Sequence, residues 1–218
     1  PGLLAHVLVS KYADHLPLYR QAGIYAREGV ELERSTLADW VGAAARLLDP
    51  LVKALSNHVL AAEKLHADDT PVPVLQPGRG TTKTGRLWTY VRDDRPAGSA
   101  TPPAVWFRYS PDRKGVRPLE HLGSFTGILQ ADGYAGFDQL YQSKPITEAA
   151  CWAHVRRKCY DRHQATDSPR AAEALARIGA LYAIEAEIRG RPPEERRQIR
   201  QARAGPLLIE LHAWLTAT

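Results

Sequence analysis

The order of helix-like and strand-like segments is the feature that most constrains the fold of this chain. Up to residue 64 the apolar residues recur with helical spacing, whereas from residue 65 short runs rich in β-branched and aromatic residues alternate with turn residues. Three strand-like runs come first, and strand and helix then alternate up to residue 151. We therefore predict an α/β (mixed α+β) chain whose mixed sheet is flanked by helices.

The N-terminal segment, residues 1–64, has the pattern of a helix-turn-helix. We predict one helix before Pro17, a second over residues 18–27 that Gly29 ends, and a third that begins at Ser35 and ends at Pro50. Two interpretations stay open, because this geometry also occurs in small helical bundles that never touch DNA and because the segment has no net charge.

Two acidic residues lie on strands that can be neighbours in such a sheet. Asp68 lies in the first predicted strand and Asp132 at the end of the fourth. Close carboxylates repel each other unless a cation such as Mg²⁺ lies between them, and a pair of metal ions can hold the reacting oxygens of a phosphodiester. The alternative is that each Asp only ends its strand and forms a turn.

A glycine-rich basic stretch over residues 76–86, which contains Lys83, separates the first two strands. It has no Gly-Lys-Ser/Thr sequence, so it is not a Walker phosphate loop. It is either a plain hairpin connection or a basic loop close to an anionic substrate.

The last third of the chain carries most of the excess positive charge. The chain has 29 basic and 24 acidic residues, and residues 149–218 hold twelve and eight of them. A helix from Trp152 to His163 would turn Trp152, Val155 and Cys159 toward the sheet and present a basic face opposite. That face either contacts phosphates or is only solvated.

Composition narrows the class of protein further. With only Cys151 and Cys159, the chain has no disulfide scaffold, and we expect a reducing, cytoplasmic location. No stretch approaches the roughly 18 consecutive apolar residues of a membrane span, so we expect no membrane partner. The chain contains no Met, even at position 1, and we expect it to begin inside a longer reading frame.

Five strings, in this order, closely resemble the insertion-sequence sixty-six family of bacterial transposases. They are HADDTPV (66–72), KTGRLWTY (83–90), YSPDRKG (109–115), LQADGYAGF (129–137) and CWAHVRRK (151–158). The likeness extends over essentially the whole chain.

The resemblance implies a DDE transposase with a ribonuclease-H-like core that binds Mg²⁺ or Mn²⁺. In that pattern Asp68 and Asp132 match the first two catalytic, metal-binding acids, while Asp69 stands where the family more often has Glu and could share the metal role. The supporting or DNA-contacting residues that we nominate are Lys83, Lys114, His154, Arg156, Arg157 and Lys158.

The third acid of the family pattern has no match in this chain, so we expect the chain alone to be inactive. The implied organisation is a helix-turn-helix-like segment (1–64), an incomplete catalytic core (65–165) and an α-helical insertion (166–218). The implied function is cleavage and strand transfer at the ends of an insertion sequence. Its implied partners are DNA (element ends and target), further copies of the protein on DNA and accessory transposition proteins. Two alternatives are a non-catalytic DNA-binding or regulatory remnant and a metal-dependent nuclease with the same core.

Overall fold

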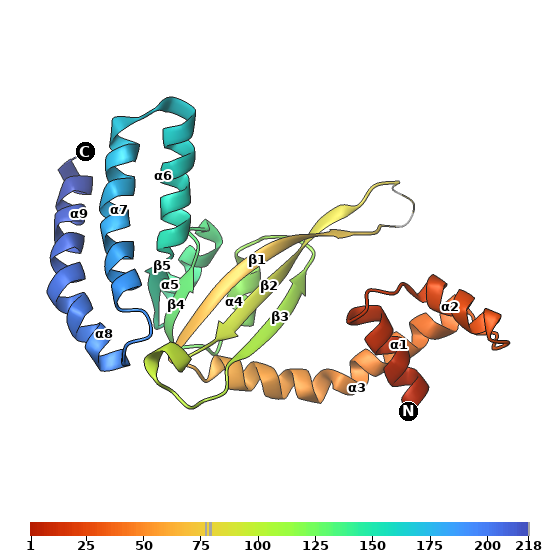
Figure 1. The fold of residues 1–218 in the computed structure, drawn as a ribbon. Coiled ribbons are helices and arrows are strands. Elements are labelled where there is room, and N and C mark those ends of the chain that lie inside the picture. Colours follow the sequence, from red (N-terminus) through yellow and green to blue (C-terminus); the bar gives the residue numbers. More distant parts are fainter. Residues whose placement is uncertain (77, 79, 218) are drawn as a thin grey trace. The chain divides into compact units, whose positions relative to one another are not determined.

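The computed structural model describes residues 1–76, 78 and 80–217, which form two compact units, Pro1–Ser56 and Asn57–Thr218 (Figure 1). Helix α3 (Arg34–Leu60) begins in the first unit and ends in the second. Each unit has a core of its own, and each is described separately below.

The first unit contains α1 (Gly2–Tyr12), α2 (Leu18–Arg27) and most of α3. Its core consists of Val7, Tyr25 and Leu37, one residue from each helix. The buried Gln21 ties the α1–α2 turn, because its side-chain amide donates to the carbonyl oxygens of Val7 (3.3 Å) and Leu16 (3.0 Å). Helix α2 spans residues 18–27, the bounds that the sequence predicts.

The prediction that Pro50 ends the third helix is wrong. Pro50 lies inside α3, which continues to Leu60. A proline removes one backbone hydrogen bond from a helix, but the helical residues on both sides supply many more. The apolar spacing that begins at Leu37 continues past Pro50 through Leu51 and Leu55, so the pattern favoured one long helix.

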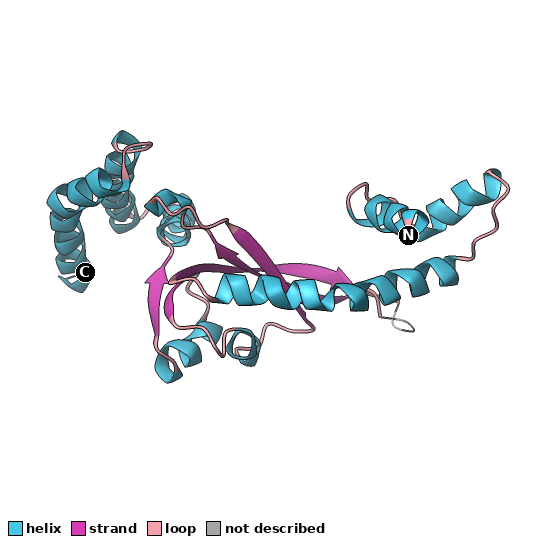
Figure 2. Ribbon diagram, turned by 90° about the horizontal axis from the view of Figure 1, so that it is seen from below, coloured by secondary structure: helices cyan, strands magenta, loops and turns pink. Residues whose placement is uncertain are grey.

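The second unit is built on one mixed sheet of five strands in the order β3-β2-β1-β4-β5, drawn in magenta in Figure 2. Strand β1 pairs antiparallel with β2 and parallel with β4, while β2–β3 is antiparallel and β4–β5 parallel. The predicted mixed sheet with flanking helices is thus confirmed. The strands are β1 (Lys64–Val74), β2 (Lys83–Arg92), β3 (Ala104–Ser110), β4 (Gly127–Ala131) and β5 (Ile146–Ala150).

Alternate residues of the strands face a core that short helices close. Leu65, Trp88, Tyr90 and Leu129 are fully buried in it, as is Phe137 from η2. The indole of Trp88 donates to the Ser110 hydroxyl at 2.7 Å. The short elements are η1 (Arg95–Ala97), α4 (Val116–His121), η2 (Ala135–Phe137) and α5 (Asp138–Ser143).

The C-terminal part of the second unit is helical. Helix α6 packs against α7, and the Ser168 hydroxyl caps α7 by accepting from the backbone N–H of Ala171. The elements are α6 (Trp152–Thr166), α7 (Pro169–Glu187), α8 (Pro193–Ile199), the π-helical turn η3 (Arg200–Ala204) and α9 (Gly205–Ala217). In the described part of the chain, no helix combines the length and the apolar character that a membrane crossing requires.

The prediction that α6 buries an apolar stripe against the sheet is wrong. Trp152 is 39% and Val155 38% exposed, and no residue of α6 is buried. The helix leaves the sheet at the end of β5 and contacts α7 instead. Periodicity placed Trp152, Val155 and Cys159 on one side of the helix but could not say what that side would contact.

Candidate active site at the ends of strands β1 and β4

The parallel pairing of β1 and β4 brings two distant acidic residues to the same level of the sheet. Lys64 lies opposite Ile128, and His66 lies opposite Gln130, so paired residue numbers differ by 64. Asp68 and Asp132 differ by the same number, and Asp132 directly follows the last residue of β4. Neighbouring strands lie about 4.8 Å apart, and this register, continued two residues beyond its last pair, would bring the two acids to the same level.

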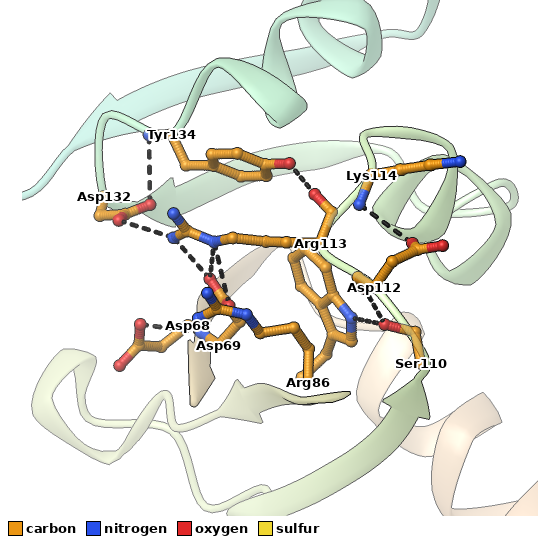
Figure 3. Close-up of polar contacts among 10 residues, drawn as sticks. Asp68, Asp69, Arg86, Ser110, Asp112, Arg113, Lys114, Asp132 and Tyr134 are labelled. Atoms are coloured by element: carbon orange, nitrogen blue, oxygen red, sulfur yellow. Dashed lines mark hydrogen bonds and ion pairs between the residues drawn. The ribbon is translucent and has the colours of Figure 1, made fainter. Parts of the chain in front are cut away.

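Asp68 and Asp69 are neighbours in β1 but have opposite environments, because successive strand residues face opposite sides of a sheet. The Asp68 side chain is exposed, and its Oδ1 accepts a hydrogen bond from the backbone N–H of Asp69 at 2.8 Å. The Asp69 side chain is only 2% exposed, on the core side with Leu65 and Ala67. Figure 3 shows the two carboxylates pointing away from each other.

Two arginines neutralise the buried Asp69. Arg113, in the loop after β3, donates from Nη2 to Asp69 Oδ1 at 2.7 Å and from Nε to both carboxylate oxygens at 2.9 and 3.0 Å. Arg86 of β2 donates from Nη1 to Oδ2 at 3.0 Å. Both oxygens of Asp69 are therefore occupied by charge-assisted hydrogen bonds.

Arg113 also reaches Asp132. Its Nη2 lies 3.4 Å from Asp132 Oδ2, while the backbone N–H of Tyr134 donates to Asp132 Oδ1 at 3.2 Å. The guanidinium stacks on the Tyr134 ring, 4.0 Å from its centroid, and the Tyr134 hydroxyl donates to the backbone oxygen of Arg113. The hydrogen bond to Asp69 is the main cause that raises the pKa of Arg113 above its ordinary value. The loops that carry Arg113 and Asp132 are thus tied together (Figure 3).

The chemistry of these side chains suits a hard divalent cation at Asp68 and Asp132. Carboxylate oxygens are the ligands that Mg²⁺ and Mn²⁺ prefer, and within residues 1–76, 78 and 80–217 Asp68 takes part in no ion pair. At Asp132 a metal would have to displace Arg113, and Asp69 fits less well because a metal would displace two arginines from it. No group of three His, Cys, Asp or Glu side chains that could hold a metal occurs among the described residues.

Of the six supporting residues nominated from the sequence, Lys158 lies beside the loop that follows Asp132. Its amine lies 3.9 Å from the position that a Cβ on Gly133 would take, one residue from Asp132. Lys114 is exposed next to Arg113, and its backbone N–H donates to Asp112 Oδ1 at 3.1 Å. The other three α6 residues are exposed on that helix, with no hydrogen bond or ion pair to either acid: His154, Arg156 and Arg157.

The loop predicted over residues 76–86 is shorter in the structure. Lys83 is exposed as the first residue of β2, so residues 83–86 belong to that strand. Residues 77 and 79, which fall within the predicted loop, lie outside the described residues.

The arginine-rich stretch of the C-terminal helices is mostly paired inside the unit. Arg200 and Arg203 of η3 reach back to Glu185 (2.6 Å) and Glu187 (2.5 Å) of α7. Arg191 pairs with Glu195, and Arg197 with Glu194. Much of this local positive charge therefore ties helices together.

Sequence reasoning missed Arg113 and Tyr134 as members of the site. Both lie inside the strings that carry the family resemblance, but neither residue type signals a metal ligand. Three contacts identify them: the three hydrogen bonds of Arg113 to Asp69, its approach to Asp132 and its stacking on Tyr134.

Comparison with known proteins gives one consistent family. The family model described as "Transposase IS66 family" matches residues 1–218. Two curated relatives from Sinorhizobium fredii (strain NBRC 101917 / NGR234), named uncharacterized protein y4hP and uncharacterized protein y4qI, are 43% and 40% identical over 99% and 96% of this chain. The chain covers only 42% and 40% of their lengths. No solved structure matches the chain significantly.

Proposed function

Because the chain belongs to the IS66 family of transposases, we propose that it carries part of the catalytic core that cuts and joins DNA strands during transposition. The observation that carries the proposal is the parallel pairing of β1 with β4. Its register, with paired residues 64 positions apart, supports Asp68 and Asp132 as partners in one site, because the same number separates them in the sequence. The cleavage and strand-transfer activities are proposed for the whole protein, of whose relatives this chain spans about two fifths.

The topology of the sheet supports a ribonuclease-H-like core. Strand β1 lies in the middle, the antiparallel strands β2 and β3 lie on one side, and the parallel strands β4 and β5 lie on the other. This is the strand order of the ribonuclease-H-like fold that the family resemblance implies. In such a fold, acids from the first and fourth strands would meet at one edge of the sheet.

In the proposed mechanism Asp68 and Asp132 hold a divalent cation. When bound, Mg²⁺ or Mn²⁺ supplies Lewis-acid activation of the nucleophile and of the phosphate under attack. The Tyr134 backbone N–H and Arg113 fix the orientation of Asp132, one at each carboxylate oxygen. The exposed Lys158, beside Gly133, adds a cation where the DNA backbone would approach.

The partners follow from the same proposal. DNA is the substrate, both as the ends of the element and as the target. A basic excess of 29 over 24 residues favours its approach. Assembly of several copies on DNA, the involvement of accessory transposition proteins and a cytoplasmic location are part of the proposal.

The test replaces each acid by an amide of nearly the same size. In the full-length protein, Asp68→Asn or Asp132→Asn should abolish Mg²⁺-dependent cleavage of the element's own ends, because an amide cannot replace an anionic ligand. Binding of the uncleaved ends, measured by gel shift, should persist. Asp138→Asn on α5, exposed and outside the site, is the matched control that should cut normally.

Cleavage that survives in either acid variant would contradict the assignment of the site. Joined products between element ends and target DNA distinguish a transposase from a nuclease with the same core, since a nuclease stops after hydrolysis. A protein that binds the ends but neither cuts nor joins them would be a DNA-binding remnant.

A further inference from the structure

We propose that Arg113 is a DNA-contacting residue that binds a backbone phosphate next to Asp132, and that Asp69 is the residue that positions it. The inference rests on the proposed function, because it takes DNA as the ligand of this edge of the sheet. It assigns Asp69 a role other than metal binding.

The guanidinium of Arg113 donates hydrogen bonds within the protein from Nε and Nη2, and Nη1 is left for a ligand. Its Nε and Nη2 atoms donate the three hydrogen bonds to Asp69, and Nη2 also approaches Asp132. Nη1 makes no hydrogen bond with any residue that the structure describes, and Figure 3 shows no dashed line at this nitrogen. The Arg113 side chain is 35% exposed, so part of it is open to solvent.

The charges next to the free edge of Arg113 balance before Lys158 is counted. The guanidinium groups of Arg113 and Arg86 are matched by the carboxylates of Asp69 and Asp132. Lys158 adds a further cation near Gly133, in the loop that follows Asp132, and this cation favours an anion there. A planar guanidinium suits phosphate oxygens, and a nucleic acid backbone can contact two cations with consecutive phosphates.

Asp69 and Tyr134 hold Arg113 in place before any ligand arrives. The carboxylate fixes one edge of the guanidinium, and the aromatic ring supports its flat face at 4.0 Å. A long side chain that is already ordered loses little rotamer entropy on binding. Asp69, with its side chain 2% exposed, has no access to DNA and acts through Arg113.

The experiment measures how DNA affinity depends on salt. A fluorescently labelled duplex of mixed sequence is titrated with the full chain in EDTA, and its dissociation constant is measured by anisotropy over a series of KCl concentrations. Loss of one phosphate contact in Arg113→Gln should reduce the slope of log K against log [KCl] by about 0.9 and weaken binding several-fold.

The matched control is Arg117→Gln on α4. Arg117 is also an arginine paired with an aspartate, with its Nε 3.1 Å from Asp112 Oδ1, and its removal costs the protein the same charge. Arg117→Gln should keep the wild-type slope, whereas Arg113→Lys, which keeps the charge, should keep most of it. An unchanged slope in Arg113→Gln would overturn the proposal.

A second variant allows the test to be made even if Arg113→Gln does not fold. Arg113→Gln leaves Asp69 with Arg86 alone, so the double variant Asp69→Asn/Arg113→Gln replaces the buried ion pair by two neutral amides. If thermal melting shows that the single variant does not fold, the slope of the double variant decides by the same criterion. Because these measurements contain no metal, they can fail while the Asp68 and Asp132 variants still support the proposed function, and the converse also holds.

Discussion

At the scale of single residues, the candidate site depends on which side of strand β1 Asp68 and Asp69 each face. Strand alternation turns Asp68 to the exposed side and Asp69 into the core, where two arginines neutralise it. The sequence alone could not separate their roles, because both are aspartates in the same strand and the partners of Asp69 come from β2 and from the loop after β3.

A buried histidine makes the stability of the second unit depend on pH. His121 is 7% exposed, and its Nδ1 lies 2.9 Å from the Tyr90 hydroxyl. Burial lowers the pKa of His121 from 6.5 to about 4. The unfolded chain therefore binds the proton more readily, and stability is lost as the pH falls from about 6.5 to about 4.

The expected loss is about 3 kcal/mol, complete below the folded pKa. Urea unfolding at several pH values measures it, and His121→Asn, which keeps a hydrogen-bond partner for Tyr90, should remove this part of the pH dependence. An equal acid destabilisation in wild type and His121→Asn would show that other groups cause it.

At the scale of elements, β4 begins at a glycine that no other residue can replace without strain. Gly127 has φ +131°, and a Cβ there would lie 2.3 Å from the backbone oxygen of Glu63. We expect Gly127→Ala to destabilise the second unit by about 3 kcal/mol or more, because it combines backbone strain with a backbone collision. Chemical denaturation measures the change.

Gly179→Ala is the control for this substitution. Gly179 lies inside α7, where an added Cβ meets nothing within 4 Å, so alanine should stabilise the protein by about 0.5–1 kcal/mol. If Gly127→Ala were as harmless as Gly179→Ala, the close approach of Gly127 to Glu63 would be refuted.

Elements were predictable from the sequence wherever local pattern decides them. The bounds of α2 and the mixed sheet follow from helical spacing, turn residues and strand composition. The prediction from sequence failed where contacts with other parts of the protein decide the structure. Pro50 does not end α3, and Trp152 of α6 does not pack on the sheet. Arg113 became visible as a site residue only through its contacts with Asp69 and Asp132.

At the scale of the whole molecule, the two compact units have separate cores. Leu37 is fully buried in the core of Pro1–Ser56, and Leu129 in that of Asn57–Thr218. The domain boundaries expected after residues 64 and 165 stay a prediction. Separate cores suggest that the units unfold separately.

Cavity substitutions test this separation. Leu37→Ala should cost the first unit about 2–5 kcal/mol and lower its amide protection, while amides of the sheet keep theirs. Leu129→Ala should have the reverse effect. Native-state hydrogen exchange, read by mass spectrometry, locates each loss. Loss of protection in both units with either variant would mean that they unfold as one cooperative body.

The register of β1 against β4 determines where extra residues can be inserted into the chain. Because lateral hydrogen bonds set the level of Asp68 and Asp132, the amount of chain between the two strands is free to vary. Residues added to the connection 99–103, between η1 and β3, would leave the register of β1 against β4 unchanged. One residue added within β4 would instead turn Asp132 to the other side of the sheet. Insertions are therefore tolerated or harmful according to whether they fall between the strands or within them.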